Sequence, residues 1–301
     1  MSSRTVRPMQ KRHLLQASLL SAIAPRLAAA ADVASHVKPF TRETPVTEVI
    51  SDPAFEGFGR LLFPVNRGFM SGLRLGNISL TWYSHIDPEK TVEIVNHLRD
   101  LSLAGRRIFI PIWSEEEMRA EPSKRDTGLF FFPGKPGARF AVLSAGGGFA
   151  YVGAMHDSFP AALELSKRGF NAFALIYRPD AQKACEDLAR AVTVIVENAA
   201  EFGVNPEGYS LWGGSAGARM AAWVGTYGTA AFGQKAVERP AAIVMQYTGH
   251  SDFTRETPPV YANVGDDDWI ANWHGMEMRM DALQRNGIPT EFHHYPGLGL
   301  N

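Results

Sequence analysis

The 301-residue chain has the composition of an ordinary globular protein, with 45% hydrophobic and 20% charged residues. This composition excludes a mainly disordered chain, and the length is sufficient for one large buried core. The net charge of -1 gives no basic excess for binding a phosphate backbone, so nucleic acid is not an expected partner. The single cysteine, Cys185, excludes an internal disulfide bond.

Residues 1–31 differ from the rest of the chain. Basic residues precede an apolar run over 14–23, and small residues follow it. This succession predicts a signal peptide cleaved after Ala30 or Ala31, and Lys11-Arg12 resembles the basic pair of a twin-arginine signal. The apolar run is too short for a stable membrane anchor, so we expect a secreted or periplasmic protein. The alternative is a frayed amphipathic helix at the N-terminus of a cytoplasmic protein.

The remaining chain divides into an irregular N-terminal extension over 32–105 and a regular core over 106–301, with no linker that would separate independent domains. In the extension, helical spacing of apolar residues after Asp87-Pro88 predicts one helix that ends near Gly105. In the core, apolar strands alternate with helices, which predicts an α/β fold with a mostly parallel central sheet and helices on both faces. The expected strands are 107–113, 128–132, 140–144, 172–177, 209–212, 242–247, 260–264 and 291–295; the expected helices are 158–168, 180–202, a helix beginning at 216, and 272–285.

A glycine-flanked serine stands between one of these strands and the following helix, in Gly213-Gly214-Ser215-Ala216-Gly217. A sharp strand-to-helix turn strains the serine backbone and leaves no room for side chains two residues before and after it, as Gly213 and Gly217 provide. We therefore predict that Ser215 is a nucleophile and that the Ala216 amide donates to an oxyanion. The alternative is a glycine-rich turn that only packs a helix.

A second glycine-rich loop follows the strand over 140–144, in Ser144-Ala145-Gly146-Gly147-Gly148. Backbone N–H groups approach a carbonyl oxygen closely where side chains are missing, so Gly147 and Gly148 are the other predicted oxyanion donors. A dinucleotide-binding loop is disfavoured because Tyr151 stands where a third glycine is needed.

These two motifs resemble those of the α/β-hydrolase superfamily, near bacterial esterases of the acetyl-xylan-esterase and hormone-sensitive-lipase-like branches. The resemblance extends from about Arg106 to the end of the chain. Such esterases usually carry His-Gly-Gly-Gly in the oxyanion loop. This chain has Ala145 before the glycines, which keeps the backbone donors but removes a side chain that braces the loop.

The resemblance also implies an acid that orients the general base. The family pattern Val-Gly-x-x-Asp-x-Ile matches Val264-Gly265-Asp266-Asp267-Asp268-Trp269-Ile270, which indicates Asp268, with Asp266 as the second choice. An acid in this place holds an imidazole in one tautomer and stabilises its protonated form. A solvated turn is the alternative; a calcium loop lacks the required spacing.

A serine hydrolase of this kind uses a catalytic triad of serine, acid and histidine, in which the histidine is the general base. This chain has no histidine at the place where the resemblance implies one. The resemblance implies a histidine just after the turn at Tyr295-Pro296-Gly297, but the sequence ends at Asn301, so this histidine and the final helix are expected to be missing by truncation. His293 and His294 fall inside the last predicted strand, on opposite faces. His156, shortly after the oxyanion loop, is a possible pocket residue.

From this resemblance and these residues we expect a serine carboxylic-ester hydrolase that acts on small or carbohydrate-linked esters through an acyl-enzyme. The alternative is a catalytically silent α/β-hydrolase-fold binding protein, because the general-base histidine is absent from the chain end. Peptidase activity is a third possibility. No metal or organic cofactor is implied, the expected partner is a small-molecule ester, and the oligomeric state is not specified by the sequence.

Overall fold

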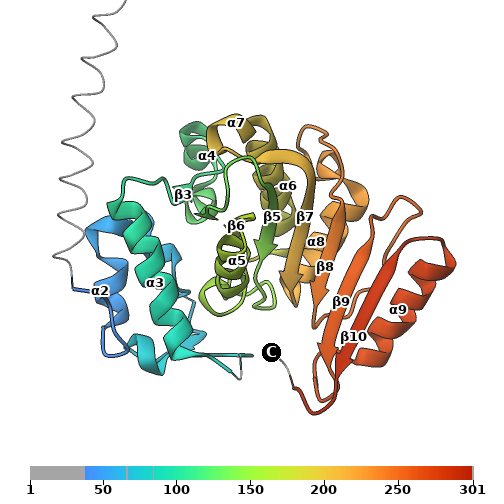
Figure 1. Cartoon of the computed structure of the whole chain (residues 1–301), viewed down its shortest axis with the longest axis horizontal. Helices are drawn as coiled ribbons and strands as arrows, with labels where there is room; N and C mark the ends of the chain where they lie inside the picture. The colour runs from blue at the N-terminus through green and yellow to red at the C-terminus, as the bar shows by residue number, and fades with distance from the viewer. Residues whose placement is uncertain (1–37, 66, 84, 300–301) are drawn as a thin grey trace, which may run out of the picture.

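The computed structural model describes residues 38–65, 67–83 and 85–299 (Figure 1). The predicted signal peptide over 1–31 lies outside the described residues. Within the part of the chain that is described, no helix is both long and apolar enough to cross a bilayer.

One eight-stranded sheet forms the centre of the molecule, with the strand order β10-β9-β8-β7-β5-β6-β4-β3. The strands β5 to β10 run parallel, whereas β4 is antiparallel to β6 and β3 is antiparallel to β4. This confirms the mostly parallel sheet. The strands are β3 (Phe109–Ile110), β4 (Gly128–Phe132), β5 (Arg139–Ser144), β6 (Asn171–Ile176), β7 (Asn205–Gly214), β8 (Ala242–Gln246), β9 (Val260–Gly265) and β10 (Thr290–Tyr295).

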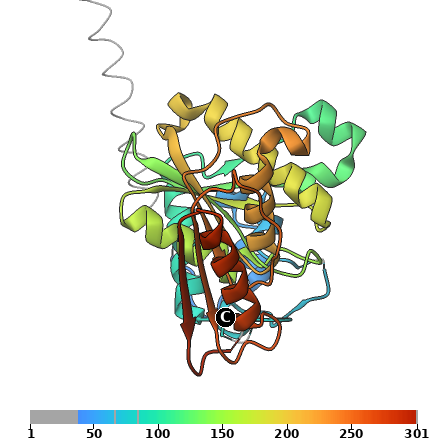
Figure 2. The same cartoon turned by 90° about the vertical axis from the view of Figure 1, so that its right-hand side faces the viewer.

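Helices cover both faces of the sheet, as the alternation of strands and helices predicts. Figure 2 shows the sheet from its β10 end, with α9 alongside that strand. The helices are α2 (Val46–Ile50), α3 (Pro88–Leu103), α4 (Glu115–Ala120), α5 (Ser158–Lys167), α6 (Ala181–Glu197), α7 (Ala199–Phe202), α8 (Ala216–Tyr227) and α9 (Trp273–Arg285). The strand expected over 107–113 is shortened to β3, and the helix expected over 180–202 is divided into α6 and α7 at Asn198.

Two apolar clusters, one on each face of the sheet, form the core. Alternate side chains of β4, such as Leu129 and Phe130, enter different clusters because successive strand residues point to opposite faces. One cluster joins the sheet to α6, α8 and α9. The other joins it to α5 and α3, together with the small antiparallel pair β1 (Met70–Ser71) and β2 (Ser79–Leu80) nearby. The described part of the N-terminal extension therefore packs on the same face as α5.

The parallel strands all end at one edge of the sheet, and this arrangement positions the candidate site. The glycine loop follows β5, Ser215 follows β7, and Asp268 lies in the loop after β9. In open α/β sheets, ligands bind beyond the carboxyl ends of the strands. The fold thus gathers residues that are far apart in the sequence.

Candidate active site

Ser215 lies in a sharp turn between β7 and α8. Its backbone has φ 49° and ψ -117°, a strained conformation for a residue with a side chain. A Cβ atom on Gly213 would overlap the backbone of Gly217, and one on Gly217 would overlap the carbonyl oxygen of Ser144. Close contact between β5, β7 and α8 therefore requires both glycines. This strand–turn–helix geometry is the one that the sequence analysis predicted for a nucleophile elbow.

The predicted oxyanion residues lie beside Ser215. Gly147 and Gly148 line the same cavity as the serine, and both have positive φ angles of 129° and 61°. Ala216 is the first residue of α8, so its amide has no acceptor within that helix. The structure thus brings together the serine and the three residues whose backbone amides are predicted to hold an oxyanion.

The cavity beside Ser215 has a volume of about 410 Å³, within the range of small-molecule sites. Its wall includes two partly accessible indoles: Trp82 is 37% exposed and Trp269 is 76% exposed. The Trp82 ring stacks on Tyr151 with centroids 5.8 Å apart, which fixes that side of the cavity. The complete lining is Trp82, Tyr83, Gly147, Gly148, Ser215, Tyr247, Trp269 and Ile270.

Asp268 directly precedes two of these lining residues and is buried. Its Oδ1 accepts hydrogen bonds of 2.8 Å from the amides of Ile270 and Ala271. Its Oδ2 is buried and has no hydrogen-bond partner among the described residues. One carboxylate oxygen is therefore fixed by the backbone, while the other is left for a further donor.

Asp266 and the two histidines of β10 form contacts of their own. His294 Nδ1 lies 2.6 Å from Asp266 Oδ1, and its ring stacks on Trp273 of α9. His293 Nε2 lies 2.7 Å from Glu291 Oε1. Neither histidine lines the cavity, and the second-choice acid is already paired with an imidazole.

His156 is turned toward α3, so the expectation that it lines the pocket is corrected. Its Nδ1 lies 3.5 Å from Thr91 Oγ1, and its Nε2 is buried without a partner in the described part of the chain. Burial lowers the pKa of His156 to about 4, which keeps the ring neutral near neutral pH. The short helical turn that carries His156 is packed against α3 and α5, and this packing sets the direction of the ring.

Three polar side chains next to Ser215 were missed by the sequence analysis. Asp157 accepts hydrogen bonds from the Tyr83 hydroxyl at 3.0 Å, from the Gly146 amide at 2.5 Å, and from the Tyr247 hydroxyl. Tyr83 and Tyr247 also line the cavity. They come from segments more than 150 residues apart, so no local motif could have indicated this cluster.

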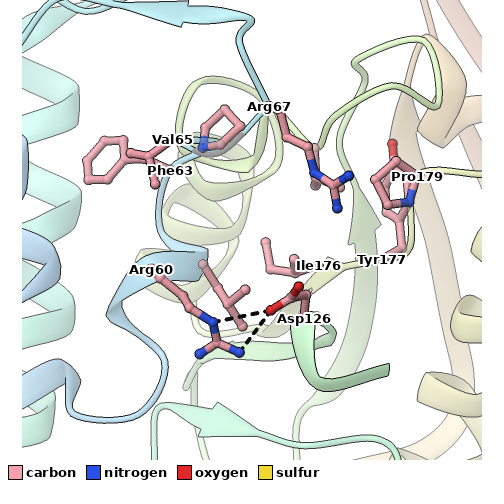
Figure 3. Close-up of a pocket in the computed structure, with 11 residues that line it drawn as sticks. Arg60, Phe63, Val65, Arg67, Asp126, Ile176, Tyr177 and Pro179 are labelled. Carbon is pink, nitrogen blue, oxygen red and sulfur yellow. Dashed lines mark hydrogen bonds and ion pairs between the residues drawn. The ribbon is translucent and has the colours of Figure 1, made fainter. Parts of the chain in front are cut away.

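A second cavity, of about 330 Å³, lies near the carboxyl end of β6 (Figure 3). Arg60 and Asp126 form an ion pair of 2.9 Å on its wall, and Arg67 is also part of the lining. Neither Ser215 nor the glycine loop contributes to this cavity. It is therefore separate from the candidate reaction site.

Comparison with known proteins agrees with this geometry. The BD-FAE family model matches residues 135–279, which include the glycine loop, Ser215 and Asp268. No curated protein matches the chain.

Solved structures show the same arrangement of the core. The chain has the α/β-hydrolase fold. An α/β-hydrolase enzyme from a Medee basin deep-sea metagenome library is 20% identical, with a TM-score of 0.53 over 64% of this chain and 82% of that one. The acetyl ester-xyloside bifunctional hydrolase of Caldicellulosiruptor lactoaceticus is 21% identical, with a TM-score of 0.56 over 64% and 87%. A thermophilic esterase of Thermogutta terrifontis is 19% identical, with a TM-score of 0.51 over 58% and 79%.

In α/β hydrolases the triad follows the chain order serine, acid, histidine. Ser215 follows β7 and Asp268 follows β9, with the parallel strand β8 between them, so the predicted serine and acid occur in that order. The described residues place no histidine on the wall of the cavity that Ser215 lines.

Proposed function

We propose that the chain is a serine carboxylic-ester hydrolase. The observation that carries the proposal is the strained Ser215 elbow, which lies beside the glycine loop and lines the same small-molecule cavity. Backbone strain of this kind persists where the surrounding structure enforces it, and it is typical of functional sites. The esterase neighbours share this fold, which supports an ester substrate.

In the proposed mechanism Ser215 Oγ attacks the ester carbonyl carbon and its proton passes to a general base. The carbonyl electrons move to the oxygen, where the amides of Gly147, Gly148 and Ala216 hold the negative charge. The tetrahedral intermediate then collapses: the carbonyl re-forms, the bond to the leaving oxygen breaks, and the base returns its proton to that oxygen, which releases the neutral alcohol and leaves an acyl group on the serine. Water repeats the attack and releases the acid. Asp268 Oδ2 is the acceptor proposed to orient an imidazole base.

The second candidate function is a binding protein without turnover. The observation that favours it is that none of the cavity-lining residues in the described ranges is a histidine. Without a base, the serine keeps its proton near neutral pH, and removal of the base in a well-studied serine protease lowers turnover on the order of 10⁶-fold.

For the substrate, we propose a small or carbohydrate-linked ester. The accessible rings of Trp82 and Trp269 line the same cavity as Ser215 and offer flat apolar surfaces on which a sugar ring can pack. The Caldicellulosiruptor lactoaceticus neighbour is an acetyl ester-xyloside hydrolase, which is consistent with such a substrate.

Labelling by a fluorophosphonate tests the nucleophile, because the probe forms a bond only with an activated serine. We expect the protein purified from its native host to be labelled, and we expect Ser215→Ala in that protein to lose both labelling and hydrolysis of a short-chain nitrophenyl ester by several orders of magnitude. His156→Gln and His294→Gln serve as matched controls. We expect both to react at the wild-type rate, since neither imidazole faces the cavity. Binding of the ester by an unlabelled wild-type chain would establish the second function instead.

We also propose that the protein is exported, because basic, apolar and small residues follow one another over 1–31 as they do in a signal peptide. N-terminal sequencing of the protein from its native host should begin near Ala31 or Asp32. Recovery of the protein with Met1 intact from the cytosol would exclude cleavage.

A further inference from the structure

The glycine loop after β5 is fixed by other parts of the protein. Its Ala145 is buried and offers no polar side chain, whereas the Tyr177 hydroxyl donates to the Ala145 carbonyl at 2.7 Å. The Gly146 carbonyl accepts from the Gly153 amide at 3.0 Å, and the Gly147 carbonyl accepts from the Ala150 amide at 2.9 Å. These bonds hold the carbonyl groups of the loop and leave the Gly146 amide to be fixed by another group.

Asp157 accepts a hydrogen bond of 2.5 Å from that amide, even though it occupies the N-cap position of α5. Aspartate at an N-cap normally accepts bonds from the first amides of its own helix, a contribution of about 1 kcal/mol. Here its side chain makes no capping bond and reaches the Gly146 amide instead. The carboxylate therefore does not stabilise the N-terminus of α5 and instead holds the glycine loop.

Two phenols complete the surroundings of the Asp157 carboxylate. The hydroxyls of Tyr83 and Tyr247 donate to it from two segments that are far apart in the sequence and both line the cavity. Burial, followed by the charge of Asp157, raises the pKa of Tyr83 well above its usual value, so this hydroxyl stays protonated and donates. Burial raises the pKa of Asp157, and the three hydrogen bonds that its carboxylate accepts oppose this rise by stabilising the ionised form.

The cluster is in direct contact with the nucleophile elbow. A Cβ atom on Gly214 would lie 2.7 Å from Asp157 Oδ2, and one on Gly146 would lie 3.0 Å from the Ser215 Cβ. A shift of the carboxylate would therefore be transmitted both to the residue before the nucleophile and to the residue before the oxyanion donors.

We propose that Asp157 is a positioning residue that clamps the glycine loop against Ser215 in the geometry required to hold an oxyanion. This inference rests on the proposed function, because it assigns a role in transition-state stabilisation. Asp157 acts through the Gly146 amide, and the catalytic groups remain Ser215 and the backbone amides. In this chain the clamp replaces the brace that a histidine before the glycines gives related esterases.

Loss of the clamp should affect transition-state binding more than substrate binding. Loss of one oxyanion donor lowers kcat by roughly 10²–10³-fold. Misplacement of the loop keeps the donors, so it should lower kcat by about 10–100-fold. Interactions made only in the transition state change kcat and leave KM nearly constant. Each phenol supplies only one of the hydrogen bonds to the carboxylate, so each Tyr→Phe change should lower kcat less than Asp157→Asn does.

The experiment compares Asp157→Asn, Tyr83→Phe and Tyr247→Phe with the wild-type chain. Tyr227→Phe is the matched control, since the Tyr227 hydroxyl donates to Asp252 at 2.7 Å in a tyrosine–aspartate pair outside the cavity. One measurement is hydrogen–deuterium exchange over 145–153. The other is the affinity for phenylboronic acid, which forms a tetrahedral adduct on serine, relative to the affinity for a neutral amide analogue.

We expect Asp157→Asn to speed amide exchange over 145–153 and to weaken boronate binding about 10–100-fold with little change in affinity for the amide. Tyr227→Phe should change neither measurement. Unchanged exchange in Asp157→Asn, or an equal loss of both affinities, would overturn the clamp. Boronate binding that survives in Ser215→Ala, or is absent from the wild type, would instead overturn the proposed function.

Discussion

Asp268 and Asp266 lie two residues apart after β9, yet their carboxylates have different surroundings. Asp268 is buried, receives two backbone amides on Oδ1 and keeps Oδ2 unpaired within the described chain. A buried oxygen that lacks a hydrogen bond carries a desolvation cost of about 1–3 kcal/mol, which a donor would remove. Asp266 is partly accessible and pairs with His294. The unpaired oxygen therefore favours Asp268 as the residue that orients a base.

Asp268→Asn tests this assignment without removing the Oδ1 acceptor for the backbone amides. The new amide nitrogen replaces Oδ2 with a donor, which is unable to accept a hydrogen bond from the N–H group of an imidazole. In a well-studied serine-protease triad the same change lowers kcat on the order of 10⁴-fold, and we expect a loss of similar order in ester turnover. Asp266→Asn, measured in the same assay, should retain nearly all activity. The reverse ranking would transfer the role to Asp266.

At the level of elements, the elbow depends on how closely α8 approaches β5. Gly217 lies in the first turn of α8, and a Cβ atom there would overlap the Ser144 carbonyl oxygen at the end of β5. Both partners are backbone, so neither a rotamer change nor a small side-chain shift relieves the overlap. The helix would have to move away from the sheet and take Ser215 with it.

Gly217→Ala should therefore lower the free energy of unfolding by about 3 kcal/mol or more, as expected of severe overpacking. Gly275→Ala is a matched control in α9, where the added Cβ would meet no atom within 4 Å. Alanine is the better helix former by about 1 kcal/mol, so this variant should be slightly more stable than the wild type. Urea denaturation measures both changes. Equal stabilities for the two variants would contradict the close contact at the elbow.

The elements that the sequence predicted well are those specified by local patterns. The β4 range 128–132 was predicted without error, because its apolar run is bounded by turn residues. Its antiparallel direction depends on the path of the chain around the sheet, which a short apolar run does not encode. The break between α6 and α7 was also missed. Asn198 leaves helical geometry there while its side chain donates to the Val194 carbonyl at 2.8 Å.

The candidate site divides in the same way. Ser215, the glycine loop and Asp268 each sit in a short motif after a strand, so the sequence indicates them directly. Asp157 and its tyrosine partners have no such motif, and only the fold brings them together. For His156 the sequence indicated a role that the structure does not show. Its position shortly after the oxyanion loop suggested a pocket residue, but its side chain points toward Thr91 of α3.

At the scale of the whole molecule, two partly buried histidines, His156 and His250, have buried Nε2 atoms and lowered pKa values. Burial lowers the pKa of His156, between α3 and α5, to about 4. Burial and the nearby Arg279 charge lower the pKa of His250, which lies against Trp223 of α8, to about 4 as well. In the unfolded chain both would titrate near pH 6.5, so between these values the unfolded state binds more protons than the folded state.

The contribution of these histidines to the free energy of unfolding should therefore be fully present above pH 6.5. It should decrease as the pH falls from 6.5 toward 4 and should change little below pH 4. Each histidine should account for roughly 2–3 kcal/mol of the difference between pH 7 and pH 4.5. The raised pKa of buried Asp157 acts in the opposite sense, because its ionised form is disfavoured by folding. Urea denaturation at the two pH values should show a smaller difference in His156→Gln and His250→Gln. His293→Gln, at an exposed position, should keep the wild-type difference in the free energy of unfolding between the two pH values. An equal difference in all three variants would rule out the neutral histidines as the cause of the pH dependence.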